Sequence, residues 1–339
     1  MLLGRVEAAS REPRRAEAIP VLAAVAEALA LSGHGERARA LTEGLAANRN
    51  LESQLLPVVR ALLATGRFDE AERQARTAVV DQQRHLLDLV ARALGDPSQS
   101  EPPEHFEWEC GGGRPVKGGT AHHLLPAPEQ WVSVVEAERR AVRARTLREE
   151  GRDDEAAREL TRAVAAARGI LRYTAAPLPA VVRAQTALGR TVEAAELLRE
   201  ATSHVQRLNG LGERSFLAEA LVAAGRNEEA VVLAWTRAYR FEDTSTTQLD
   251  LVGILARSGQ HELAEDLLEA LARRGLARAR AYADLALAHP DPARARELTA
   301  LALHTGPWYE ALPAVLRHEP GALPLVLAEA DRLRRTLEV

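Results

Sequence analysis

The chain has 339 residues, enough for a large core built either as two globular domains or as one long array. Hydrophobic residues make up 46% of it and aromatic residues only 4%, and no β-branched or aromatic run alternates with period two, so the composition excludes a β fold and predicts an all-α one. The net charge of −4 argues against broad nucleic-acid binding, which needs a clustered positive excess.

The use of basic residues and cysteine bears on where the protein works. Lys117 is the only lysine, and all other basic residues are arginine, which favours a GC-rich, bacterial source. Cys110 is the only cysteine, so an intramolecular disulfide is excluded and a reducing compartment fits. Arg5 and Glu7 interrupt the apolar run that a signal peptide needs, and no apolar segment is long enough to span a bilayer. We therefore expect a cytoplasmic protein that makes no membrane contact.

A helical pair is predicted to repeat along the chain. Leu2–Ser10 is the first predicted element, and it resembles half of such a pair. After it, an apolar helical stretch is followed by glycine, four other residues, mostly polar, and an alanine that opens a second helix. The predicted turn glycines, about 34 residues apart where the repeat is uninterrupted, are Gly33, Gly66, Gly151, Gly189, Gly225 and Gly259. The matching alanines are Ala38, Ala71, Ala156, Ala194, Ala230 and Ala264, with a weaker copy that ends at Ala295.

Each part of this unit has a physical reason. Glycine ends the first helix because it adopts the left-handed cap conformation at little cost, and small alanine lets the paired helices approach closely. Apolar residues eight and four positions before the glycine share one face and should contact the partner helix: Val25, Leu29, Val58, Leu62, Leu217, Leu221, Leu251 and Leu255. Arg143 and Gln185 break this pattern. Four residues into the second helix the residue is usually apolar again, as at Ala75, Leu160, Leu198, Ala234 and Leu268.

The repeat is interrupted after Gly66. Residues 82–94 are predicted to form a first helix that ends in a turn at Gly95, and residues 96–129 are predicted to form a Gly/Pro-rich loop. Its candidate metal ligands do not match a zinc spacing, so no metal is expected: His105, Cys110, His122 and His123. Two interpretations of the loop stay open. It folds over a groove with Phe106 and Trp108 as anchors, or it is an uninvolved linker.

The glycine–alanine turns resemble those of the tetratricopeptide repeat, from about Pro20 to Ala302. The resemblance implies a right-handed α-solenoid of about seven to eight antiparallel helix pairs. The spacing drifts and the proline that usually closes each unit is mostly missing, so a HEAT-like or irregular helical repeat is the alternative. The expected organisation is one continuous array: helical repeats over 1–95, the loop over 96–129, further repeats over 130–306 and capping helices over 307–339.

The sequence carries no recognisable catalytic constellation. Acidic pairs such as Asp153–Asp154 stand at predicted helix N-termini, where negative charge is favourable. Their presence therefore needs no catalytic role. No GxSxG, HExxH or GxGxxG motif is present. We therefore expect a protein that is not an enzyme and has no cofactor.

In arrays of the resembling family, first helices line a concave groove. By that analogy the residue six positions before each turn glycine faces the groove, which gives Glu27, Arg60, Arg145, Arg183, Glu219 and Gly253, with Leu89 in the interrupted unit and Arg148 and Leu63 alongside. The predicted binding residues are Arg60, Arg145, Arg148, Arg183 and Glu219. Arg60, Arg145 and Arg183 would form a basic stripe for a carboxylate-bearing or acidic peptide. The alternative is that they are ordinary solvated arginines paired with nearby glutamates.

The sequence thus predicts a non-catalytic scaffold or adaptor that binds a peptide or protein segment. A sensor domain for a peptide or small ligand is the alternative. An RNA-binding array and an enzyme with a cleft are disfavoured, and the oligomeric state stays open.

Overall fold

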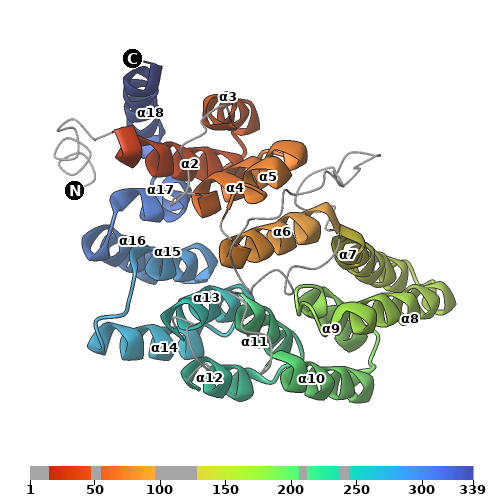
Figure 1. Cartoon of the computed structure of the whole chain (residues 1–339). Coiled ribbons are helices and arrows are strands. Elements are labelled where there is room, and N and C mark those ends of the chain that lie inside the picture. Colours follow the sequence, from red (N-terminus) through yellow and green to blue (C-terminus); the bar gives the residue numbers. More distant parts are fainter. Residues whose placement is uncertain are drawn as a thin grey trace. The chain divides into compact units, whose positions relative to one another are not determined.

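The computed structural model describes residues 15–46, 55–78, 80–95, 128–205, 212–236 and 244–338 (Figure 1). Every regular element within these ranges is helical, which confirms the all-α class: there are 17 α-helices and two short 3-10 helices. The half-repeat expected at Leu2–Ser10 lies outside the described residues, and so do residues 96–127 of the expected loop, with all its candidate ligands and aromatic anchors.

The chain divides into two compact units. Unit 1 comprises Met1–Gln74 and Gln248–Val339, and unit 2 comprises Ala75–Thr247. One boundary falls within α5 (Phe68–Ala75) and the other within α13 (Thr244–Arg257). Each unit is therefore described by itself.

Unit 2 is built from successive helical hairpins. Its helices are α6 (Val80–Gly95), α7 (Pro128–Glu149), α8 (Asp153–Ile170), α9 (Leu178–Ala187), α10 (Thr191–Val205), α11 (Glu213–Ala223) and α12 (Asn227–Trp235). The first helices of the hairpins pack on one another in chain order, α6 on α7, α7 on α9 and α9 on α11. This arrangement places equivalent positions of α6, α7, α9 and α11 side by side.

Unit 1 joins segments from both ends of the sequence. Its remaining helices are α2 (Arg15–Leu31), α3 (Gly35–Ala46), α4 (Leu55–Ala64), α14 (His261–Arg273), α15 (Ala279–Ala288), α16 (Pro292–Thr305), η2 (Trp308–Ala311), α17 (Leu312–His318), η3 (Pro320–Ala322) and α18 (Leu323–Glu338). Helix α2 packs on α3 and α4, and also on α17 and α18 of the segment predicted to cap the array (Figure 1). In a linear solenoid each repeat contacts only its neighbours. The contact of α2 with α17 and α18 is therefore not expected for a linear solenoid.

The composition of α2 explains its position. Ile19, Leu22, Val25 and Leu29 are buried, and so are three of the four alanines between them, because neighbours cover the helix on several sides. A helix that is apolar all round is stable only when buried all round. None of the helices that the structure describes is both long enough and apolar enough to cross a bilayer.

The helical turns confirm the expected repeat chemistry. All six predicted turn glycines have left-handed backbones, with φ from +74° at Gly189 to +82° at Gly33. At a representative turn the Arg190 N–H donates to the Gln185 carbonyl at 2.8 Å, and the Gly189 N–H donates to Thr186 at 3.0 Å. These bonds satisfy carbonyls at the end of the first helix. The alanines that open the second helices are buried, as are the residues predicted to face the partner helix.

Gly95 differs from these six glycines, and the rest of the turn predicted there, residues 96 and 97, lies outside the described residues. Gly95 is the last residue of α6, it is buried, and its backbone is not left-handed. A Cβ atom on Gly95 would lie 2.3 Å from the Cβ of Glu138 and 3.0 Å from the carbonyl oxygen of Val135. Glycine is therefore needed at this position because α7 crosses α6 too closely for any side chain.

Candidate functional site

The predicted binding residues are divided between the units. Arg145 and Arg148 lie on α7, Arg183 on α9 and Glu219 on α11, all in unit 2, whereas Arg60 lies on α4 in unit 1. A stripe that joins Arg60 to the other arginines therefore stays a prediction.

Several of these groups are paired within the protein. The Arg183 Nη1 donates to Glu219 Oε1 at 3.0 Å, and Arg148 forms an ion pair with Asp153 at the start of α8. Arg145 makes no hydrogen bond or ion pair with any residue that the structure describes, and the same holds for Arg60. Within the described residues, these two guanidinium groups are the ones of the predicted set that could bind a partner without breaking a hydrogen bond or ion pair.

Arg92, which the sequence did not predict as a site residue, joins several first helices of unit 2. The Arg92 Nε on α6 donates to Glu138 Oε1 at 3.1 Å, and its Nη2 lies 3.1 Å from both carboxylate oxygens of Glu219. The guanidinium also lies 5.0 Å from the centroid of the Phe216 ring. Arg92 stands three residues before Gly95. In two other units the residue at this position was predicted to face the groove, so the place of Arg92 in the repeat could have marked it as a candidate.

Burial dominates the electrostatics of this cluster. It raises the pKa of Glu138 to about 7, although the charges of Arg92 and Arg183 act in the opposite direction. The two arginines and two glutamates compensate one another inside the protein. This cluster is therefore a cross-link between helices α6, α7, α9 and α11, and it offers few unpaired groups to a ligand.

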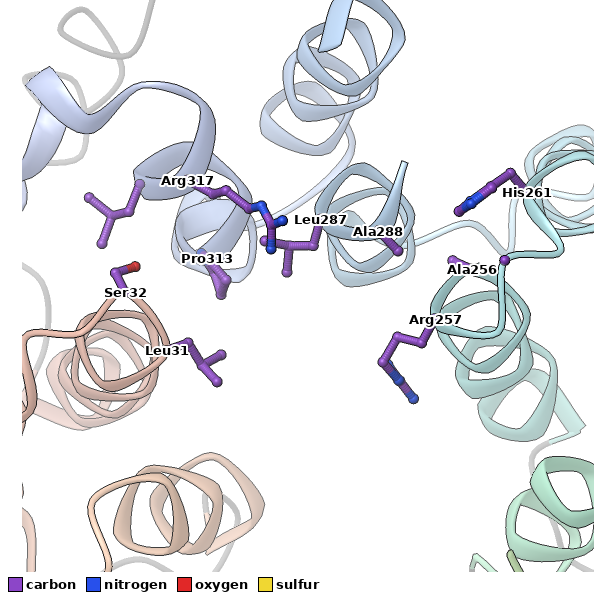
Figure 2. A pocket seen from close by; sticks show the side chains of 11 residues that line it. Leu31, Ser32, Ala256, Arg257, His261, Leu287, Ala288, Pro313 and Arg317 are labelled. Carbon is purple, nitrogen blue, oxygen red and sulfur yellow. The ribbon is translucent and has the colours of Figure 1, made fainter. Parts of the chain in front are cut away.

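Unit 1 contains a cavity of about 820 Å³ at the ends of several helices (Figure 2). It lies among the C-terminal ends of α2, α13, α15 and α17 and the start of α14. The lining residues are Leu31, Ser32, Ala256, Arg257, Gly259, His261, Leu287, Ala288, Pro313, Leu316 and Arg317. We refer to this cavity as the unit 1 pocket.

The unit 1 pocket combines an apolar wall with unpaired cationic groups. Leu31, on the apolar wall, is 64% exposed. Arg257 and Arg317 make no hydrogen bond or ion pair within the part of the chain that the structure describes. In Figure 2 Leu31 and Arg257 extend toward the space from opposite sides, and Arg317 lies beside Leu287.

His261 adds a polar group to the same wall. Its Nδ1 is buried and has no hydrogen-bond partner among the described atoms, and its ring lies 5.4 Å from that of His289, measured between centroids. A buried polar atom without a partner is rare in proteins and is satisfied when a ligand or water supplies the bond. The pocket chemistry therefore suits a ligand that has an anionic group next to an apolar one.

None of these residues belongs to the predicted site, because the pocket is assembled from helices far apart in the sequence. One local signal was present. Leu31 and Arg257 both stand two residues before a turn glycine, where three other units have alanine: Ala64, Ala187 and Ala223. A large side chain at this exposed position was therefore visible in the sequence. Within the described residues, no three potential ligands are grouped so that they could hold a metal ion.

Comparison of the chain with models of known protein families, with curated proteins and with solved structures finds no match.

Proposed function

We propose that the chain is a non-catalytic binding module of the tetratricopeptide-like kind, and that the unit 1 pocket takes a carboxylate-bearing segment of another protein. The observation that carries this proposal is the pairing of an exposed leucine with two arginines that have no partner within the described chain. Guanidinium groups bind carboxylates through two parallel hydrogen bonds. An apolar side chain of the bound segment, next to its carboxylate, would exclude water from the apolar wall of the pocket. A segment with an acidic residue close to an aliphatic one fits both requirements.

The helical hairpins supply a rigid support for such a site. Each pocket side chain belongs to a helix end or to the turn that follows it, and the turns at Gly33 and Gly259 are fixed by left-handed caps. Rigid presentation lowers the entropy lost when a flexible segment binds. We propose the cytoplasm as the place of action, where such a segment would come from another soluble protein or a protein's exposed tail.

A second candidate function is favoured by the pocket's size. A volume of about 820 Å³ lies within the range of roughly 300–1,000 Å³ typical of small-ligand sites. A sensor domain that binds a small organic anion is therefore the alternative occupant. The same arginines would bind its carboxylate.

A peptide array tests the main proposal. Dodecapeptides in a Gly/Ser background would carry one Leu or Val and one Asp or Glu at spacings of one to four residues, with Asn and Gln versions as neutral partners. We expect acidic peptides to bind at least tenfold more tightly than their neutral partners, as measured by fluorescence polarisation. We expect the Arg257→Gln/Arg317→Gln variant to lose that preference.

The matched control removes two exposed arginines of unit 1 that do not line the pocket, in the Arg273→Gln/Arg296→Gln variant. It should bind like wild type. A preference that survives Arg257→Gln/Arg317→Gln but is lost in Arg60→Gln/Arg145→Gln would move the docking site to the predicted stripe. A wild-type protein that binds no peptide of the array but is stabilised thermally by small organic acids would favour the sensor, and binding of neither class contradicts both functions.

A further inference from the structure

We infer that the unit 1 pocket is complete only while α2 is docked on the C-terminal helices of unit 1, and that the Glu27–Arg280 ion pair holds α2 in that position. Ligand binding and α2 docking are then two coupled equilibria. The inference rests on the proposed function of the pocket and adds its regulation.

The wall of the unit 1 pocket comes from two separate segments of the chain. Leu31 and Ser32 come from the end of α2 and the turn after it, whereas every other lining residue lies between Ala256 and Arg317. Helix α2 contacts η2 and α17 of this second segment, and also α18, which follows it along the chain. If α2 moved away, the arginines and His261 would remain, but the exposed leucine opposite them would be lost.

An ion pair joins α2 to α15 of the second segment. Glu27 accepts two hydrogen bonds from Arg280, from Nη2 at 3.1 Å and from Nη1 at 3.3 Å. Both side chains are largely buried, and two parallel bonds fix the rotation of the helix as well as its distance. Leu31 follows Glu27 by four residues, one helical turn, and therefore lies on the same face of α2. The ion pair thus sets the orientation of the pocket leucine.

Arg280 is surrounded by acidic groups besides Glu27. Its Nε forms a further ion pair with Asp284 at 2.9 Å, and its backbone N–H donates to Glu310 Oε2 at 3.3 Å. Burial acts to raise the pKa of Glu27, but the charges of Arg280 and Arg60 outweigh it and hold that pKa below its ordinary value. Glu27 is therefore ionised at neutral pH. Without the Arg280 guanidinium, Glu27 and Asp284 would lose the cation that both contact, and only the charge of Arg60 would still act on Glu27. The docking of α2 on α15 would therefore weaken, because Glu27 would be left largely buried without its ion pair.

The consequence is reciprocal coupling. A ligand that touches both Leu31 and the arginines binds the docked form better than the undocked form, so it shifts the equilibrium toward docking. By thermodynamic linkage, any change that weakens docking weakens binding by the same factor. Helix α2 and its connections thereby report whether the pocket is occupied.

Hydrogen exchange on the full chain tests this coupling. The probe is the tightest-binding acidic peptide of the array described above, used at saturation, and the readout is amide exchange in peptides from α2. We expect the probe to slow this exchange at least tenfold in wild type and not in Arg257→Gln/Arg317→Gln. Arg280→Gln should speed exchange in α2 at least tenfold without the probe and weaken probe binding by a similar factor, and Arg280→Lys, which keeps the charge, should recover part of both effects.

The control is Arg294→Gln, which breaks an ion pair of unit 1 that joins α16 to Glu265 of α14 and does not involve α2. It should leave probe affinity unchanged. Probe binding that leaves α2 exchange in wild type unaltered overturns the inference and leaves the proposed function standing. A wild-type protein that binds no array peptide overturns both. Fast exchange in α16 of Arg280→Gln would show that this variant unfolds unit 1 as a whole. In that case the effect of the probe on α2 exchange in wild type and in Arg280→Lys decides whether binding and docking are coupled.

Discussion

Arg92 donates a hydrogen bond to Glu138 at 3.1 Å, yet the pKa of that carboxyl group is raised to about 7. Burial is the cause, because the free energy lost when the carboxylate leaves water exceeds the free energy gained from its ion pair with Arg92. Arg92 also binds Glu219, so its charge is shared between two carboxylates. The contact between α6 and α7 therefore has a protonation step close to neutral pH.

This relationship predicts the pH dependence of stability. In the folded protein Glu138 keeps its proton above the ordinary pKa of 4.5, where the unfolded chain has lost it, so the folded state binds more protons between pH 4.5 and about 7. The contribution of Glu138 to the free energy of unfolding is complete below pH 4.5 and is lost as the pH rises through 7. Glu138→Gln removes the titrating group. We therefore expect the free energy of unfolding of the variant, minus that of wild type, to rise by about 3 kcal/mol between pH 4.5 and 8.

Urea unfolding followed by circular dichroism at each pH measures this difference. Glu136→Gln is the control, since Glu136 lies on the same helix but is exposed. A wild-type-minus-variant difference that stays constant from pH 4.5 to 8 would contradict the burial argument.

Arg183 supplies a second prediction on the same carboxyl group. Its charge lowers the pKa of Glu138, and it also neutralises Glu219, whose own charge raises that pKa. We expect Arg183→Gln to move the midpoint of the Glu138-dependent stability change to higher pH. Arg145→Gln, one of the predicted stripe residues without an ion pair in the described chain, should leave the midpoint where it is. Equal midpoints in the two variants would mean that Arg183 does not act on Glu138.

The features that sequence predicted correctly are local ones. The left-handed glycines and the buried alanines follow from helix capping and from close packing within one hairpin, so residues only a few positions apart determine them. The same holds for the apolar faces of the first and second helices, which the 3.6-residue period sets.

The features that sequence did not predict depend on distant pairs. No sequence pattern shows that α7 crosses α6 closely at Gly95. Arg92 reaches Glu219 across 127 positions, and Glu27 reaches Arg280 across 253. The apolar character of α2 on every face was a usable signal that other helices cover it, but it did not name α17 and α18 as those helices.

The close crossing at Gly95 gives a test by substitution. We expect Gly95→Ala to destabilise the protein by about 1–3 kcal/mol, because the new methyl group would overlap the side chain of Glu138 and the backbone of α7. Gly169→Ala in α8 is the matched change, since nothing lies within 4 Å of its Cβ position. It should be neutral or stabilise by up to about 1 kcal/mol, the usual gain when alanine replaces glycine in a helix. Similar losses in both variants would rule out a specific contact at Gly95.

The alanine that opens each second helix gives the last test, and it addresses the helical hairpin itself. Ala156 is fully buried between α7 and α8, whereas its neighbour Ala157 is partly exposed. We expect Ala156→Leu to lower the free energy of unfolding by about 1–3 kcal/mol, because the added carbon atoms must push the two helices apart. Ala157→Leu adds the same atoms beside a surface that can accommodate them, so it should change stability by less than about 0.5 kcal/mol. Urea unfolding of the two variants measures the contrast. If both variants lost the same stability, helix propensity or solvation would account for it, and close approach of the paired helices would not be the reason for alanine at this position.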